Sequence, residues 1–312
     1  MPLSPPRHAL PESARLAPVA MSDGWAVRTL ELDPEGSARG TLLFQGGRGD
    51  FVEKYAEEVV GWAARGWRVR SFDWRGQGGS GRLGRDTSVG HVTDFAPWIS
   101  DLAELATRWR EGSSGPFVAI GHSMGGHLVL RALIERAVHA DAAVLVAPMI
   151  GTAGPPPVIG RWMAEGLARL GAPDRAAWRA NDKPGRVPGG RQSLLTHDDD
   201  RYAAELWWRE FHPELIVGPP SWSWLAAAYR SSLASFTPAR LATVTTPILV
   251  LSALADRLVD PDATRRAGER LPNAELIEYG DSARHEILRE VDVVRDHALA
   301  AIADFLDRHA GG

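Results

Sequence analysis

The chain of 312 residues contains no cysteine. This absence excludes disulfide bonds, metal sites built from thiolates and a cysteine nucleophile. The chain also lacks an excess of positive charge, because 35 Lys and Arg stand against 39 Asp and Glu and give a net charge of −4. Without a basic block to neutralise phosphates, nucleic acid is not expected as a partner.

Long hydrophobic runs are missing as well. Residues 1–24 are rich in proline and contain no unbroken apolar stretch of the kind that forms a signal peptide. No later window is long and apolar enough to span a bilayer. We therefore expect a cytoplasmic protein, with peripheral membrane contact left open. The hydrophobic content of 44% is typical of a globular protein with a substantial core.

Short apolar runs alternate with helical patterns in the first half of the chain. Residues 40–45, 67–72 and 116–120 are predicted as strands, and helical patterns at residues 53–65 and 91–110 follow the first two of them. Another helix opens at Ser123, and the run "AAVLVAP" after it predicts a further buried strand. This alternation predicts an α/β fold, a mostly parallel sheet with helices on its faces.

The alternation stops between residues 150 and 236, where proline, glycine and tryptophan separate short helical pieces. Strand patterns return at residues 247–251 and 274–279, and an amphipathic helix is predicted near the end of the chain. We therefore predict a core formed by residues 1–149 and 237–312, with residues 150–236 inserted before the last strands as a helical cap.

The pentapeptide Gly121-His122-Ser123-Met124-Gly125 lies between a predicted strand and a predicted helix. A G-x-S-x-G sequence in this context predicts a nucleophile elbow, in which tight packing of the turn requires the two glycines. The Met124 N–H would then face a developing oxyanion. The structural alternative is a glycine-rich turn with Ser123 as the helix N-cap. His122 and His127 are too close to the turn to reach the serine, and we expect them to pack around it.

A serine nucleophile needs a histidine and a carboxylate, in the chain order Ser, Asp or Glu, His. Asp256 and His285 follow the two late strands, so both are expected at the same sheet edge as Ser123. Asp260 competes with Asp256, but Pro261 directly after it fits a helix that Asp260 caps. The sequence therefore favours Ser123, Asp256 and His285 as the catalytic set.

A second oxyanion donor is expected after the early strand. Gly46 and Gly47 allow the backbone to turn inward there, and the N–H of Arg48 is the candidate donor. The alternative is that the two glycines merely form a turn.

Residues 72–84, "FDWRGQGGSGRLG", contain a G-x-G-x-x-G match, which would favour a nucleotide-dependent oxidoreductase. That fingerprint needs a helix directly after the glycines and an acidic residue about 20 positions further on. Here two more glycines follow, and Asp94 falls inside a helical pattern. This context argues against a nucleotide site.

Several segments together resemble the bacterial lysophospholipases of the α/β-hydrolase superfamily, which are relatives of the monoglyceride lipases. The similarity begins near Gly40 and includes the cap. The segments that carry it are "GGRGDFVEKYAE", "DWRGQGGSGRLG" with the later "GHV", "GHSMGG", "LLTHDDDRY", "GPPSWSWL" and "RHEIL".

The resemblance implies hydrolysis of the single acyl ester of a monoacyl lipid, a lysophospholipid or a monoacylglycerol, without a cofactor. It implies that residues 72–84 form a loop beside the site, in which Asp73 and Arg75 make structural hydrogen bonds. By position it implies that Ser123 is the nucleophile, Asp256 the acid and His285 the base, with the Arg48 and Met124 amides as the oxyanion hole. One departure concerns the first donor, because monoglyceride lipases begin this loop with His-Gly where the present chain has Gly46-Gly47.

Six of the twelve tryptophans fall in the cap, with Met163 and Phe211 nearby. We expect most of them to pack the cap onto the core, and one or two to line the entrance to an acyl site or meet a lipid surface. The cap tryptophans are Trp162, Trp178, Trp207, Trp208, Trp222 and Trp224.

The same catalytic set would also suit a general carboxylesterase, a thioesterase or an acyltransferase, and a non-catalytic lipid-binding module is a further alternative.

Overall fold

The computed structural model describes residues 6–178 and 190–311, and residues 179–189 of the predicted cap lie outside them. Eight strands form one sheet in the order β1-β2-β4-β3-β5-β6-β7-β8. At one edge β1 pairs with β2 and β2 with β4, both antiparallel. The neighbouring strands β4, β3, β5, β6, β7 and β8 are all parallel to one another. The predicted α/β fold is therefore confirmed. The strands are β1 (Arg15–Ala20), β2 (Ala26–Leu32), β3 (Gly40–Gln45), β4 (Trp67–Phe72), β5 (Phe117–His122), β6 (Ala142–Val146), β7 (Ile248–Ala253) and β8 (Ala274–Tyr279).

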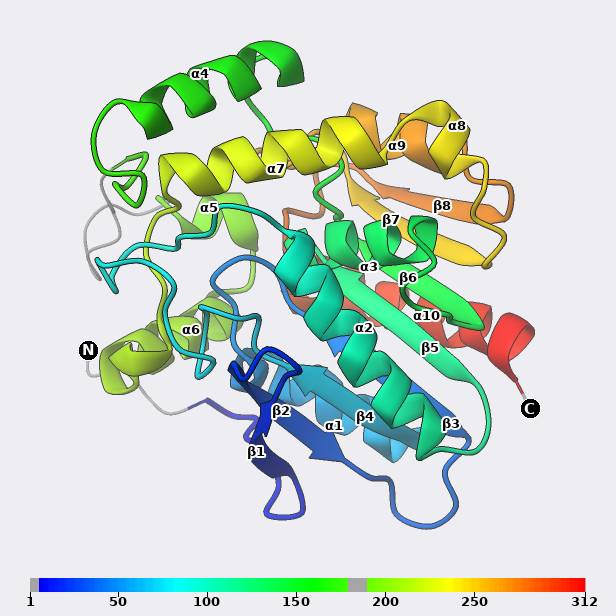
Figure 1. The fold of residues 1–312 in the computed structure, drawn as a ribbon. Coiled ribbons are helices and arrows are strands. Elements are labelled where there is room, and N and C mark those ends of the chain that lie inside the picture. Colours follow the sequence, from blue (N-terminus) through cyan, green and yellow to red (C-terminus); the bar gives the residue numbers. More distant parts are fainter. Residues whose placement is uncertain (1–5, 179–189, 312) are drawn as a thin grey trace.

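Helices cover both faces of the sheet (Figure 1). α1 (Ala56–Ala64) and α10 (Asp292–Ala310) pack on one face, while α2 (Ala96–Glu111), α3 (Met124–Ile134) and α9 (Pro261–Gly268) pack on the other. A strand between two helical layers is buried on both sides, so every residue of β3, β5, β6 and β7 is buried.

Between β6 and β7 the described chain forms helices, and no strand of the sheet is found in that part. Helices α4 and α7 run side by side (Figure 1). Gly160 permits their close approach, because a Cβ there would collide with the Tyr229 ring. No helix among the described residues combines the length and apolar character that crossing a bilayer requires. The elements of this part are α4 (Pro157–Arg169), α5 (Gln192–Leu195), α6 (Asp199–Phe211), η2 (Pro213–Leu215) and α7 (Trp222–Ser235), and α8 (Pro238–Leu241) leads into β7.

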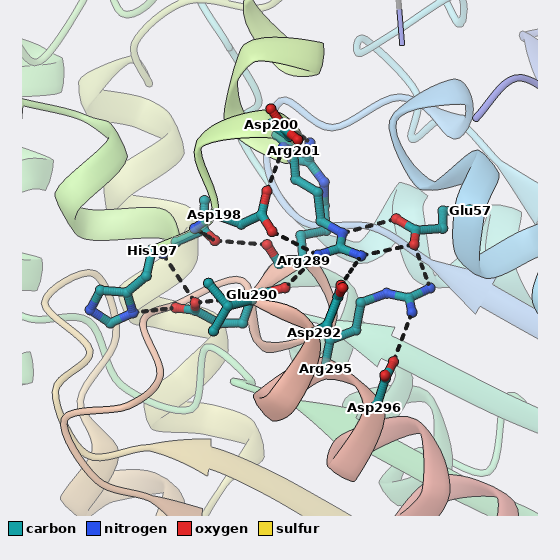
Figure 2. A network of polar contacts seen from close by, with 12 residues as sticks. Glu57, His197, Asp198, Asp200, Arg201, Arg289, Glu290, Asp292, Arg295 and Asp296 are labelled. Atoms are coloured by element: carbon teal, nitrogen blue, oxygen red, sulfur yellow. Dashed lines mark hydrogen bonds and ion pairs between the residues drawn. The ribbon is translucent and has the colours of Figure 1, made fainter. Parts of the chain in front are cut away.

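Helix α6 is fastened to the core by Arg201, which lies at the centre of the ion network in Figure 2. Its guanidinium lies 2.9 Å from Glu57 of α1 and 2.8 Å from Asp292 at the start of α10. It also donates a hydrogen bond to the Glu290 carbonyl at 2.8 Å. This network holds the segment after His285 between α6 and the core.

Some element boundaries differ from the prediction. The helical pattern at 91–110 becomes a helix at Ala96, because Pro97 suits the first turn of a helix and not its interior. The pattern at 53–65 divides into the short η1 (Val52–Tyr55) and α1. The edge strands β1 and β2 were not predicted, since β1 is mostly exposed and contains Pro18, which leaves no apolar alternation.

Candidate active site

Ser123 occupies the turn between β5 and α3 in a left-handed conformation, with φ of 53° and ψ of −118°. Non-glycine residues seldom adopt this conformation, which costs about 1–3 kcal/mol. The flanking glycines make the turn feasible, because a Cβ on Gly121 would lie 2.6 Å from the backbone of Gly125. A Cβ on Gly125 would collide with the carbonyl oxygen of Gln45. Ser123 occupies the N-cap position of α3, but its side chain makes no capping hydrogen bond, so capping does not explain a serine at this position.

The structure brings the three predicted catalytic residues together. His285 Nε2 lies 2.9 Å from Ser123 Oγ, and His285 Nδ1 lies 2.6 Å from Asp256 Oδ2. The other carboxylate oxygen of Asp256 accepts hydrogen bonds from the Leu258 and Val259 amides at 2.8 and 3.1 Å. These contacts orient the carboxylate toward the imidazole and leave Nε2 directed at the serine.

Asp260, the competing carboxylate, has a structural role. It is the N-cap of α9 and accepts hydrogen bonds from the Asp262 and Ala263 amides at 3.0 and 3.2 Å, with Pro261 in the first turn. The predicted capping role of Asp260 is confirmed.

The electrostatic surroundings of His285 favour its charged form. Burial alone would lower the pKa of this histidine, but the charge and hydrogen bond of Asp256, with Glu286 and Asp50 nearby, raise the pKa above its ordinary value. Burial opposes ionisation of Asp256 as well, and the contact with His285 together with two backbone amides lowers its pKa. An imidazole in this setting can accept a proton from Ser123 and hold it as a stabilised imidazolium.

The two histidines close to the elbow have other roles, as expected. The His122 ring lies 4.8 Å from the His285 ring, and burial together with the charge of His285 lowers the pKa of His122 to about 4. His127 is fully buried, with its ring nitrogens 2.7 Å from the Met149 carbonyl and 2.7 Å from Ser231 Oγ. Burial also lowers the pKa of His127 to about 4. Both pack as neutral rings at neutral pH.

The Gly46-Gly47 turn lies against the nucleophile. A Cβ on Gly47 would be 3.0 Å from Ser123 Cβ, so a side chain there would crowd the nucleophile. The Gly47 N–H donates a hydrogen bond to Asp50 Oδ2 at 2.7 Å, and this bond holds the turn in place. The predicted oxyanion donors flank the contact, since Arg48 follows Gly47 and Met124 follows Ser123. Met124 is the first residue of α3, where an N–H has no acceptor within the helix, and the donor roles stay a prediction.

A buried charge cluster stands behind this turn, and no pattern in the sequence indicated it. Lys54 Nζ lies 2.8 Å from Asp50 Oδ1, 2.7 Å from Glu286 Oε1 and 3.0 Å from Glu205 Oε2 of α6. Burial would lower the pKa of Lys54, but the three carboxylates hold it above its ordinary value. The cluster thereby links the turn beside Ser123, helix α6 and the residue after His285.

A cavity of about 1100 Å³ opens at Ser123 and His285. Its walls come from the sheet edge and from α4, α6 and α7, and many of its side chains are apolar. A larger and more open hollow beside loop 78–89 contains none of the three predicted catalytic residues. The apolar side chains that line the cavity include Met163, Leu195, Leu206, Trp222, Trp224 and Tyr229.

Fewer of the six cap tryptophans are buried than predicted. Trp224 is buried at 5% exposure, whereas Trp162 and Trp178 are exposed and the other three are half-buried. Trp178, Trp222 and Trp224 line the cavity that contains Ser123. Core packing therefore accounts for fewer of the six than expected. Trp162 lies on the outward apolar face of α4, and Trp178 lies beyond the end of that helix.

The glycine-rich stretch at residues 72–84 forms a loop, as predicted. Gly78 has a φ of +50°, and a Cβ there would collide with the Asp73 carboxylate. That carboxylate accepts hydrogen bonds from the Val52 and Gly79 amides at 2.9 and 2.7 Å. Arg75 pairs with Asp101 at 2.6 Å. The structural roles predicted for Asp73 and Arg75 are confirmed.

A mostly parallel α/β sheet with a serine on a strained strand-to-helix turn, and a histidine and an aspartate in reach at the same edge, defines an α/β-hydrolase. Residues 36–292 match the family model described as serine aminopeptidase, S33. Over 273 residues the chain is 32% identical to lysophospholipase L2 of Escherichia coli strain K12, covering 84% of this chain and 79% of the relative. The chain therefore belongs to the serine aminopeptidase S33 family of α/β-hydrolases, which confirms the predicted relationship.

Other relatives agree with this assignment. The chain is 24% identical over 282 residues to the probable lysophospholipase L2 of Haemophilus influenzae, covering 88% of this chain and 86% of the relative. A soluble variant of monoglyceride lipase from Saccharomyces cerevisiae has the same fold, with a TM-score of 0.79, 19% identity, and 98% and 99% of the two chains covered. The monoacylglycerol lipase of Paleococcus ferrophilus matches with a TM-score of 0.70, 21% identity, and 91% and 99% covered. These findings support a carboxylic ester hydrolase activity.

Proposed function

We propose that this hydrolase cleaves the single acyl ester of lysophospholipids or monoacylglycerols through an acyl-enzyme on Ser123. The observation that carries the proposal is the position of the His285 imidazole, 2.9 Å from Ser123 Oγ and 2.6 Å from Asp256 at the base of a largely apolar cavity. The names of the relatives, lysophospholipase and monoglyceride lipase, point to substrates with one acyl chain.

In the proposed reaction His285 Nε2 accepts the proton of Ser123 as Oγ attacks the ester carbonyl carbon. The carbonyl oxygen becomes an oxyanion, to which the Arg48 and Met124 amides donate hydrogen bonds. The C–O bond to the glycerol breaks, and the imidazolium gives its proton to the leaving oxygen. His285 then takes a proton from water, which attacks the carbonyl carbon of the acyl-enzyme. The C–O bond to Ser123 breaks, the imidazolium returns its proton to Ser123 Oγ, and the fatty acid is released.

We also propose that residues 150–236 act as a cap over a core of residues 1–149 and 237–312. The cap contributes α4, α6 and α7 to the walls of the cavity, where apolar side chains suit an acyl chain. Peripheral contact with a lipid surface belongs to this proposal, because Val158, Trp162 and Leu170 of α4 and its C-cap expose 56%, 66% and 70% of their surface. Trp162→Ser is expected to weaken flotation with vesicles.

A release assay tests the proposed function. Purified protein is given lysophosphatidylcholine, a monoacylglycerol and a short-chain nitrophenyl ester, with Ser123→Ala as the control variant. The proposal expects fatty acid release from at least one of the two lipids and none above background from the variant. Cleavage of the short ester alone would favour a general carboxylesterase. Acyl transfer to an added alcohol would identify an acyltransferase, and cleavage of an acyl thioester in place of the lipids would identify a thioesterase.

A further inference from the structure

The cavity that contains Ser123 carries more positive than negative charge, in a chain whose net charge is −4. Two carboxylates line it, and both contact the Lys54 ammonium at 2.8 and 2.7 Å, which offsets part of their charge. A cavity with this excess favours a substrate that carries an anionic group. The charged side chains of the lining are the arginines Arg48, Arg191, Arg209 and Arg257 and the carboxylates Asp50 and Glu286.

Three of these arginines have partners in the protein. Arg48 donates to the Gly218 carbonyl at 2.8 Å, and Arg191 and Arg209 lie 3.1 and 3.5 Å from Glu205. Arg257 is exposed and lines the cavity, and within residues 6–178 and 190–311 its side chain has neither an ion pair nor a hydrogen bond. Its guanidinium is therefore available to a ligand.

The backbone at Arg257 is held in a fixed relation to the catalytic set. Arg257 directly follows Asp256, whose Oδ1 accepts hydrogen bonds from the next two amides, those of Leu258 and Val259. The Leu258 carbonyl in turn accepts a hydrogen bond from the Ala153 amide at 3.1 Å. The same carboxylate that orients His285 thus anchors the turn that carries Arg257.

We propose that Arg257 binds the anionic phosphate of a lysophospholipid whose acyl ester lies at Ser123; this inference rests on the proposed function. In such a lipid a glycerol unit joins the ester to the phosphate, so the phosphate lies on the side of the leaving alcohol while the acyl chain occupies the apolar wall. A guanidinium can donate two parallel hydrogen bonds to phosphate oxygens. A monoacylglycerol has no such group, so Arg257 favours the phosphate-bearing substrate.

The test compares lysophosphatidylglycerol with a monoacylglycerol of the same short acyl chain, both below their micelle concentrations. In Arg257→Gln the ratio of kcat/KM for the phospholipid to kcat/KM for the neutral lipid is expected to fall about tenfold, because KM for the phospholipid rises. Arg257→Lys keeps the positive charge and is expected to retain part of the preference for the phospholipid. The matched control is Arg270→Gln, an exposed arginine outside the cavity lining, which should keep the wild-type ratio. An unchanged ratio in Arg257→Gln would overturn the proposal while leaving the proposed function intact.

A binding measurement separates this inference from the proposed function. In the Ser123→Ala background, calorimetry should show that Arg257→Gln weakens lysophosphatidylglycerol binding about tenfold. If the wild type binds the phospholipid in this Arg257-dependent manner and hydrolyses neither lipid, the phosphate site stands and the proposed function fails. If inorganic phosphate alone binds as tightly with the same dependence on Arg257, the site is one for free phosphate and the lipid headgroup proposal is wrong.

Discussion

Asp50 Oδ2 accepts a hydrogen bond from the Gly47 amide at 2.7 Å, directly behind the point where Gly47 packs against Ser123. The turn that presents the Arg48 amide is therefore fixed by a buried carboxylate, which Lys54 and the Tyr55 hydroxyl hold in place at 2.8 and 2.9 Å. We predict that Asp50 acts on the reaction through this turn, as a positioning residue.

We expect Asp50→Asn to lower kcat by about 10²-fold with a smaller change in KM, because a misplaced oxyanion donor weakens the transition state more than the bound substrate. Lys54 keeps Glu205 and Glu286 as partners, so the fold should persist. Steady-state kinetics on an ester substrate provide the measurement, and exposed Asp281→Asn is the matched control. A wild-type kcat in Asp50→Asn would refute the positioning role.

The pH profile should report the raised pKa of His285. As a general base His285 must be neutral, so kcat/KM is expected to fall as the pH drops through a pKa that lies above the ordinary value of 6.5. Asp256→Asn removes the charge that raises this pKa, so the midpoint should move to lower pH while the plateau falls by about 10⁴-fold. Asp260→Asn changes a helix cap and an ion pair with Arg266, neither of which contacts His285, and should keep the midpoint. The reverse behaviour of the two variants would assign the acid to Asp260.

Acid sensitivity of the fold is expected from His127. Its pKa is about 4 in the folded protein against 6.5 for the ordinary residue, so between these values the unfolded chain binds more protons. The contribution of His127 to the free energy of unfolding is complete above pH 6.5. It declines as the pH falls and is smaller by about 2 kcal/mol at pH 5. His127→Gln should reduce the difference in unfolding free energy between about pH 7.5 and pH 5 by a similar amount. Urea unfolding measures it, with exposed His139→Gln as the control; an unchanged difference in His127→Gln would contradict the prediction.

The predicted catalytic residues could be found in the sequence because each stands at a recognisable strand end. Ser123 has glycines on both sides, and Asp256 and His285 each follow an apolar run that forms β7 or β8. Parallel strands bring their carboxyl ends to one edge, so residues separated by as much as 162 positions in the chain meet there.

Other features depend on contacts that no local pattern encodes. Lys54 and Glu286 are separated by 232 positions, and neither has a distinctive neighbourhood in the sequence. The i,i+4 spacing of Asp50 and Lys54 is common on any helix surface, so it did not indicate a buried cluster. The outward apolar face of α4 was also hidden, because the sequence of an amphipathic helix does not say which face meets the protein.

The covalent intermediate on Ser123 is the centre of the proposed reaction, and labelling with an acyl-mimicking fluorophosphonate followed by peptide mass spectrometry tests it most directly. We predict one adduct, on Ser123, that is absent from Ser123→Ala, together with a loss of turnover of about 10⁶-fold in that variant. An adduct on another residue, or equal labelling and turnover in Ser123→Ala, would contradict the assignment of Ser123 as the nucleophile.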